Sequence, residues 1–550
     1  MLVNLLFLIL GAGLVSELVP KNRLPVLWSL FSSAAVMYFI YRLYLLGAAP
    51  DFRLVYPWLK IPNLSINLEI TINAHNIYLV SALLVLALLV LMQNTFGSET
   101  AKNALNGLVL LNLLSALMLV FAANYIQMLV AVGVSDVLVF SIINKVEAKK
   151  RYIYANFLAD IGLVSIFAVI LGQSGNIELG PLADYARLGH HKDFVAIMLL
   201  LCIFIKTGLF LFQGTYVGLR LLGFNRLNLI VFTATPLTGY LLLLKTESLL
   251  TISAYSYPLL KIFALASILW GVYGALIIDN LRQKAVYFAL MFWGLVYAFA
   301  AFGSRLASLD FAMLLMAAFL FSQILLLISV AASNENMVSE MGGFIKNLKF
   351  TFLLIVAILS AYFSALLMLQ PDNLWLVWGY IVLFGLVSSQ IIGQILLGES
   401  HADERVQAML HNPPALMWLP AACMAAGMGY YFRIAPFYLV PVLSGWLLLF
   451  AVRPLRQLDR WYESDIVQEA DYMNALYEWL IITPVKVIGR VLWLTVDFIF
   501  IERTIINSVQ NALRFMIFIF RRIHSGTLGG AVLFVLLGFA VIWWSWRYGG

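Results

Sequence analysis

The sequence predicts an all-α polytopic membrane protein with about 14 to 16 transmembrane helices, some of them broken, and an amphipathic lateral helix before the last span. Two observations predict this fold. Of the 550 residues, 63% are hydrophobic and 11% are charged, whereas a soluble domain carries about 25% charged residues. Apolar runs near the roughly 20 residues of a spanning helix also recur along the chain. Clear examples are Leu108–Ala123, Val195–Phe212, Leu259–Ile278, Phe311–Val330 and Phe352–Leu369.

Helices are expected in these runs because lipid offers no partner for backbone polar groups, and because the runs lack the alternation of a β-barrel. The candidate spans centre near residues 10, 36, 85, 113, 134, 163, 203, 236, 268, 294, 320, 360, 386, 424, 443 and 538. We expect N-terminal helices and an extramembrane loop in 1–100, a transmembrane core in 101–400 and further transmembrane helices in 401–455. Within the first part, residues 48–77 contain proline and a strand-like alternation of apolar residues over 64–72, which predicts a structured loop.

The C-terminal hundred residues differ from the rest of the chain. From Arg453 to Arg522 charged residues alternate with large apolar ones, which is typical of a helix lying along the membrane. Pro484 should kink or break any single helix there. We therefore expect an amphipathic lateral region in 456–527, long enough to contact neighbouring subunits, and a final transmembrane helix in 528–550.

The charged residues and cysteines exclude several functions. The net charge of +7 comes largely from short basic loops, such as Lys145 to Arg151, which set membrane orientation and do not indicate nucleic-acid binding. They predict that the N-terminus lies on the outer side of the membrane. We expect the chain to be an integral protein of the bacterial inner (cytoplasmic) membrane. Cys202 and Cys423 are too few for an iron–sulfur cluster, and no histidine pattern predicts a metal site. We expect no catalytic residue, redox centre or cofactor in this chain.

Two charged residues lie inside apolar runs, where charges are costly and often functional. Lys206 follows about ten apolar residues and is a candidate proton carrier, or a lysine whose ammonium reaches the membrane interface. Asp136 lies in mid-span and is a candidate counter-ion to a lysine, or a buried carboxyl without a transport role. Asp160 opens the next span, where it could join an ion path or act as a cap or interface residue.

A proline and two further basic residues complete the candidate site. Pro236 interrupts an apolar run and predicts a helix break beside the lysine-bearing helix, or an ordinary kink. Arg282 and Lys284 begin a span, where they either face an ion path or anchor the helix at the membrane surface.

Several stretches resemble the antiporter-like membrane subunits of respiratory complex I, which are related to cation/proton antiporter subunits. The segment from Lys206 to Gln213 resembles the family's "GKSAQxPLQ" motif, which carries the key lysine of a broken helix. The segment from Asp279 to Tyr287 resembles "DIKRVLAYSTMSQIG". The C-terminal matches are the most specific, and they resemble "YDxLFVRPVKxxxRxLWxxVD" and "LRRLQTG". They are Asn474–Leu480, Pro484–Lys486, Gly489–Trp493, Val496–Asp497 and Arg521–Gly526.

The resemblance covers most of residues 80–545 and is narrowest to the distal, largest subunit, which ends in a lateral helix. It implies that residues 101–400 form an antiporter-like core. It also implies other membrane subunits as partners, contacted through the lateral helix within the lipid bilayer. The whole assembly would then be a translocase of the NADH:quinone oxidoreductase type.

The sequence departs from the family at its charged positions. The glutamate of the family's fifth span falls at Gly133, with Asp136 one turn further on, and the histidine of the family's broken helix falls at Val231. A central lysine falls at Ser322. A proton path needs protonatable groups or water at short intervals, so these losses predict a degenerate channel.

Three functions remain open from the sequence. The chain could scaffold a complex I-like assembly while keeping a partial proton half-channel through Asp136 and Lys206. It could instead translocate a cation or proton along a rearranged path of Asp136, Asp160, Lys206, Arg282 and Lys284. As a third alternative, it could anchor a soluble zinc protein in an inorganic-carbon uptake complex.

Overall fold

The computed structural model describes the greater part of the chain. It covers residues 2–18, 34–38, 52–61, 64–72, 74–96, 105–175, 178–179, 186–302, 374–392, 482–494, 506–523 and 528–548, with single positions between 311 and 366 and at 479. These residues belong to two compact units, Met1–Met473 and Asn474–Gly550. Ser322, Cys423 and the predicted spans near 424 and 443 lie outside the described residues. The five-part division of the chain stays a prediction.

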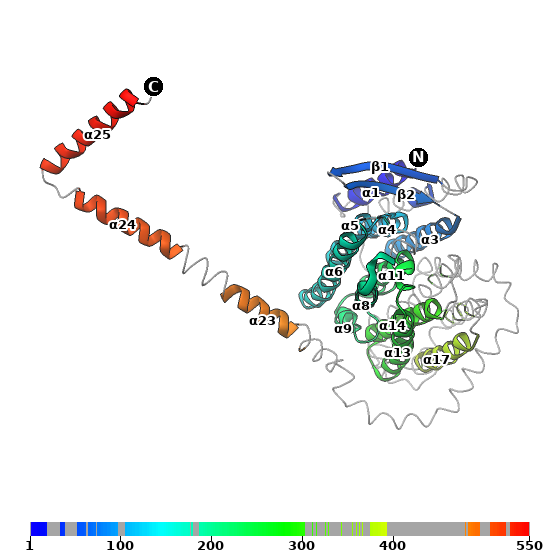
Figure 1. The fold of residues 1–550 in the computed structure, drawn as a ribbon. Coiled ribbons are helices and arrows are strands. Elements are labelled where there is room, and N and C mark those ends of the chain that lie inside the picture. The colour runs from blue at the N-terminus through cyan, green and yellow to red at the C-terminus, as the bar shows by residue number, and fades with distance from the viewer. Residues whose placement is uncertain are drawn as a thin grey trace. The chain divides into compact units, whose positions relative to one another are not determined.

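The described part is almost entirely helical, which confirms the predicted all-α polytopic membrane fold (Figure 1). The α-helices of the first unit are α1 (Leu2–Leu18), α3 (Ala74–Phe96), α4 (Asn106–Phe121), α5 (Tyr125–Ile142), α6 (Val146–Ser174), α8 (Lys192–Thr207), α9 (Gly214–Val217), α10 (Phe224–Asn228), α11 (Thr235–Lys245), α12 (Glu247–Leu250), α13 (Ser256–Ile277), α14 (Leu281–Ala301) and α17 (Leu374–Ile392). Short 3-10 helices occupy Ala186–His191 and Gly218–Leu221, and a π-helix occupies Leu229–Ala234.

Six described helical segments are long and apolar enough to cross a membrane. They are Tyr125–Ile142, Val146–Gln173, Leu188–Thr207, Arg226–Lys245, Ser256–Ile277 and Leu281–Ala301. Arg226–Lys245 and Leu281–Ala301 form the centre of the first unit, because 94% of the most apolar stretch of each segment is buried. The corresponding share for the segment in α6 is 39%. A helix that is apolar on all sides is stable only inside a bundle or in lipid.

The one sheet of the described residues is an antiparallel hairpin of β1 (Phe52–Ile61) and β2 (Leu64–Ile72). Its register pairs Phe52 with Ile72 and Ile61 with Leu64, and an irregularity between Pro57 and Leu59 accommodates the proline, which has no N–H to donate. This hairpin confirms the strand-like alternation predicted for the extramembrane loop. The Asn124 amide nitrogen, at the turn between α4 and α5, donates to the Asn67 carbonyl oxygen at 2.6 Å and attaches the hairpin there.

The second unit contains α23 (Thr483–Leu492), α24 (Asn507–Ile523) and α25 (Leu528–Tyr548). In α23, Lys486 and Arg490 are four residues apart and share one face, while Val487 and Val491 are exposed on another. The helix begins with Thr483 and Pro484 in its first turn, where proline is compatible with a helix because the missing N–H has no intrahelical partner. Among the described residues, α23 and α24 carry the amphipathic pattern predicted for this region, and the apolar α25 follows them in the chain.

Candidate functional site

The site is built around the end of α8, where the chain leaves the helix in mid-bundle. Gly208 has a φ of +68° and caps α8 by donating its N–H to the Ile205 and Phe204 carbonyl oxygens. Leu211 has a φ of +75°, which costs a residue with a Cβ roughly 1–2 kcal/mol. It is the only non-glycine with positive φ in the described part of the chain. Non-helical backbone at membrane depth occurs only inside protein or along a water-filled space.

The broken segment is held by contacts from neighbouring helices. The Phe210 backbone N–H donates to the Ser267 hydroxyl oxygen on α13 at 2.9 Å. The Tyr216 hydroxyl, on α9, donates back to the Lys206 carbonyl oxygen at 2.6 Å. The Thr207 hydroxyl lies 2.5 Å from the Tyr297 hydroxyl on α14. Lys206 therefore sits at a fixed helix end rather than in a loose loop.

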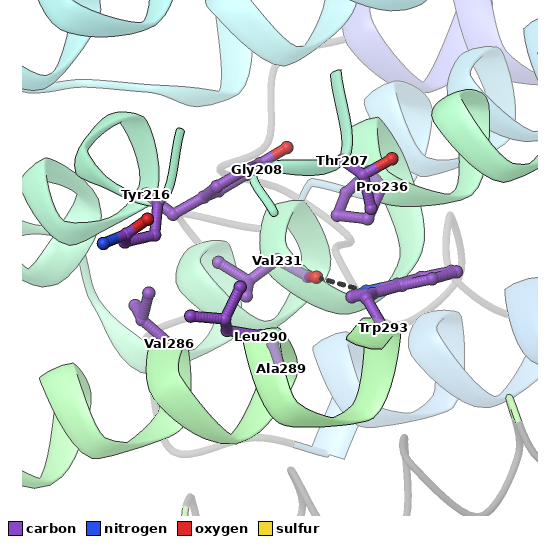
Figure 2. Close-up of a pocket in the computed structure, with 10 residues that line it drawn as sticks. Thr207, Gly208, Tyr216, Val231, Pro236, Val286, Ala289, Leu290 and Trp293 are labelled. Carbon is purple, nitrogen blue, oxygen red and sulfur yellow. Dashed lines mark hydrogen bonds between the residues drawn. The ribbon is translucent and has the colours of Figure 1, made fainter. Parts of the chain in front are cut away.

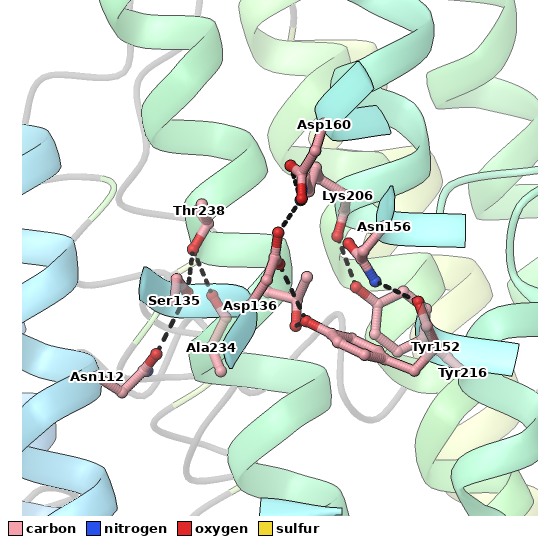
Figure 3. Close-up of polar contacts among 11 residues, drawn as sticks. Asn112, Ser135, Asp136, Tyr152, Asn156, Asp160, Lys206, Tyr216, Ala234 and Thr238 are labelled. Carbon is pink, nitrogen blue, oxygen red and sulfur yellow. Dashed lines mark hydrogen bonds and ion pairs between the residues drawn. The ribbon is translucent and has the colours of Figure 1, made fainter. Parts of the chain in front are cut away.

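Lys206 is fully buried and forms ion pairs with carboxylates from two other helices (Figure 3). Its ammonium contacts Asp136 on α5 and lies 2.7 Å from Asp160 on α6. The Asp136 side chain is 12% exposed and the Asp160 side chain is 33% exposed. The structure thus joins three of the residues proposed from the sequence in one cluster, which we call the Lys206 cluster (Lys206, Asp136 and Asp160).

Asp160 differs from its expected position. The sequence predicts it at the opening of a span, but α6 begins at Val146, so Asp160 lies in mid-helix. The basic residues at the start of α6 extend the helix on the N-terminal side of the apolar run, because lysine and arginine are good helix formers. Asp160 is therefore an ion-pair partner of Lys206 and not a helix cap.

Two hydroxyl groups that the sequence analysis did not single out extend the cluster. The Tyr152 hydroxyl donates to Asp136 at 3.2 Å and lies 3.2 Å from the Thr235 hydroxyl on α11. A signal for Tyr152 was present in the sequence, since Tyr152, Asn156 and Asp160 follow one another at four-residue spacing. That spacing puts all three on one face of α6.

A neutral polar chain lies beside Asp136. The Ser135 hydroxyl is 3.1 Å from the Thr238 hydroxyl on α11 and donates to the Asn112 side-chain oxygen on α4 at 3.4 Å. Figure 3 shows these groups on the other side of Asp136 from Tyr152. Asp136 thus stands between two sets of hydroxyl groups, one reaching α4 and one reaching α6.

The structure corrects the helix break predicted at Pro236. The chain stays helical from Phe224 to Lys245, and a π-helix over Leu229–Ala234 leads into α11, where Pro236 lies in the first turn. The wider turn accommodates the proline because its ring would clash with the carbonyl four residues earlier in a regular α-helix. The interruption of the bundle is the end of α8, after Lys206.

Arg282 and Lys284 begin α14 as predicted, but both are engaged elsewhere. Lys284 is 1% exposed, and its ammonium donates to the Ala275 carbonyl oxygen at 2.7 Å, close to the end of α13. The Arg282 guanidinium lies 5.9 Å from the centre of the Phe224 ring. Lys284 therefore stabilises a helix C-terminus, where carbonyl groups have no intrahelical donor.

Two other cations have the same role as Lys284. Arg226 donates to the Ile142 carbonyl oxygen at the end of α5 at 3.2 Å, and Lys245 donates to the Ala122 carbonyl oxygen at the end of α4 at 3.0 Å. Lys206 is different, because its described ion pairs are with carboxylates. This difference favours Lys206 over the other basic residues as an ion carrier.

The described residues contain no group of three or more histidine, cysteine, aspartate or glutamate side chains that could hold a metal. Cys202 is buried as a free thiol on α8. Whether the assembled protein carries a cofactor stays a prediction from the sequence.

The fold is similar to those of chains from two membrane complexes. A chain of the Mrp complex from Dietzia sp. DQ12-45-1b matches with a TM-score of 0.69 and 17% identity, over 92% of this chain and 63% of that one. A chain of the membrane-bound sulfane sulfur reductase, an archaeal respiratory membrane complex, matches with a TM-score of 0.63 and 13% identity, over 98% of this chain and 99% of that one. No protein-family model and no curated protein sequence matches.

The chain has the fold of these membrane-complex chains. It spans about two thirds (63%) of the length of the Mrp chain and nearly the full length (99%) of the other. This likeness agrees with the relation to antiporter-like subunits that the sequence motifs predict.

Proposed function

We propose that this chain is an antiporter-like membrane subunit of a complex I-like assembly and contributes to proton or cation translocation through a degenerate channel. The observation that carries the proposal is the Lys206 cluster. A fully buried lysine stands at the broken end of a helix and pairs with two carboxylates from different helices. Charges at membrane depth mark ion paths more often than they mark structural sites.

The charges of the Lys206 cluster suit an ion carrier. One ammonium and two carboxylates sum to one negative charge, and an uncompensated charge in a low-dielectric interior is costly. One proton or one monovalent cation would neutralise the cluster. Asp160 is the outermost member of the cluster, with a side chain that is one-third exposed, and Asp136 leads onward to the Tyr152 hydroxyl.

On the side that faces α14, the proposed channel ends at apolar residues. Val231 stands where the related subunits are expected to carry a histidine, and it lines a cavity together with Val286 and Leu290. An apolar wall offers no protonatable group. These residues support a partial path that ends near Lys206, in an assembly whose other subunits complete translocation.

The proposed partners are other membrane subunits, contacted through the lateral helices in the bilayer. The likeness to chains of two membrane complexes supports such neighbours. Large apolar residues of α23 and α24, such as Ile488 and Phe515, are exposed within the second unit. Exposed apolar surface of this kind is stable against lipid or another protein.

Affinity purification from native membranes, with mass spectrometry of the partners, tests the assembly. We expect sibling antiporter-like subunits together with subunits that carry flavin or iron–sulfur centres. A soluble zinc protein as the sole partner would overturn this proposal in favour of the inorganic-carbon uptake alternative.

A Lys206→Met variant of the purified, vesicle-reconstituted complex tests translocation. We expect a loss of at least about tenfold in the proton translocation rate, because the variant removes the ammonium that both carboxylates contact and leaves the nearly buried Asp136 without a cation. The matched control is Lys261→Met, since Lys261 lies on α13 against the Phe302 ring. Equal rates for both variants and the wild type would leave the chain a scaffold only.

A further inference from the structure

A small cavity lies on the flank of the broken segment that faces α11 and α14 (Figure 2). Its polar wall comes from the break itself and consists of Thr207, Gly208, Gln213 and Tyr216. Its apolar wall comes from the π-helix, α11 and α14 and consists of Val231, Pro236, Val286, Ala289, Leu290 and Trp293. The space inside is enough for about one water molecule.

Gln213 is the unexplained residue of this cavity. It is 1% exposed, and neither its side-chain nitrogen nor its side-chain oxygen has a hydrogen-bond partner among the described residues. A buried amide without partners costs about 1–3 kcal/mol. Buried polar groups in native proteins almost always bond to protein or ordered water, so an amide of this kind indicates a bound polar molecule.

We propose that the cavity binds a single water molecule, held by the Gln213 amide. A buried water needs two to four polar partners. The Gln213 amide supplies a donor and an acceptor, and the Tyr216 hydroxyl oxygen can still accept while its hydrogen points to the Lys206 carbonyl. Larger ligands do not fit. An ion is disfavoured because none of the lining side chains carries a charge.

The apolar wall of the cavity cannot compete for this water. The Trp293 indole N–H is the only side-chain donor among the residues of that wall, and it is already bonded to the Val231 carbonyl oxygen at 3.1 Å, as Figure 2 shows. The water would therefore bond to the broken segment alone. It would fix Gln213 and Tyr216 together and so position the backbone that carries Lys206. This role does not depend on whether the protein moves ions.

Radiolytic hydroxyl labelling of the purified full-length protein in its native complex tests the proposal directly. Radicals formed from an ordered internal water oxidise the side chains beside it, so Trp293 should be oxidised although it is 1% exposed. Tyr362 is the reference, because it is also 1% exposed and its hydroxyl lies 3.0 Å from that of Tyr380, away from the cavity. We expect Trp293 oxidation at least several-fold above that of Tyr362 in the wild type, falling to the Tyr362 level in Gln213→Met.

Gln213→Asn is the control for a folding defect in Gln213→Met. It keeps the side-chain carbonyl and NH2 groups, so Trp293 should still be labelled. Equal labelling of Trp293 and Tyr362 in the wild type would overturn the proposal. Labelling of Trp293 that persists unchanged in Gln213→Met would also overturn it, because Gln213 would then not hold the water.

The direction in which Gln213→Met shifts the melting temperature gives a second test. If water satisfies the amide, Gln213→Met removes those hydrogen bonds and lowers the melting temperature. If the cavity is dry, the same change removes an unsatisfied group and raises it. Gln283→Met is the matched control, because Gln283 is 2% exposed and accepts a hydrogen bond from Arg220 at 3.0 Å. That variant should lower the melting temperature in either case.

Discussion

Asp160 is the residue through which the Lys206 cluster reaches the surface of the first unit. Its side chain is 33% exposed, whereas Lys206 is fully buried and Asp136 is 12% exposed. Around it on α6, Phe157 and Ile161 are exposed apolar residues that face lipid or a neighbouring subunit. A carboxylate in such a surface is stable only with a cation beside it, which Lys206 provides.

Asp160→Asn tests this role at the residue scale. The variant keeps the Lys206–Asp136 pair and makes the cluster neutral, so a further cation can enter only by separating a buried pair. We expect translocation to fall by about tenfold, equivalent to about 1.4 kcal/mol in the barrier, with little loss of thermal stability. Vesicle-based pumping assays measure this. Glu147→Gln, an exposed acid on the same helix, should leave the rate unchanged, and an equal loss in both variants would contradict the prediction.

The end of α8 is the element that positions the site. A Cβ at Gly208 would overlap the ring of Tyr216, the residue that donates to the Lys206 carbonyl. Gly175 caps α6 with nearly the same φ, +67°, but a Cβ there meets nothing within 4 Å. The two positions therefore separate backbone strain from the packing of the break.

Gly208→Ala should lower the melting temperature well below that of Gly175→Ala. Both changes carry the strain of positive φ, about 1–2 kcal/mol, and only Gly208→Ala must also displace Tyr216. Overpacking of this kind adds about 1–3 kcal/mol. Thermal denaturation of the two variants side by side measures the difference. Equal melting temperatures would show that Tyr216 does not hold the broken segment.

The sequence predicted some of these elements and missed others for identifiable reasons. The apolar runs located the six spans found among the described residues. The isolated charges Lys206 and Asp136 could be proposed as a pair because few charges occur inside such runs. The break at Pro236 was misplaced, because a π-turn can accommodate a proline without ending the helix. Gln213 ends the segment that resembles the family motif, but its burial without hydrogen-bond partners could not be predicted, since that depends on the packing around it.

At the scale of the whole molecule, the first unit has a basic end and an end that carries the hairpin. Arg226 reaches the C-terminus of α5, which is followed by Lys145 and by the basic residues in the first turns of α6, and Asn124 at the opposite end holds the hairpin. The 18 residues of α5 separate these ends by about 27 Å at 1.5 Å per residue. This is close to the thickness of the hydrocarbon core.

We predict that the basic end is cytoplasmic and that the hairpin is outside, because basic loops are retained in the cytoplasm. Val55 is 44% exposed on the hairpin, and Lys145 is exposed at the other end. A membrane-impermeant thiol reagent should label Val55→Cys in intact cells and Lys145→Cys only in inverted vesicles, in a background with Cys423 replaced by serine. The buried Cys202 should stay unlabelled in both preparations. With the two spans that the sequence predicts before the hairpin, this result would also place the N-terminus outside. The reverse labelling pattern would contradict the predicted orientation.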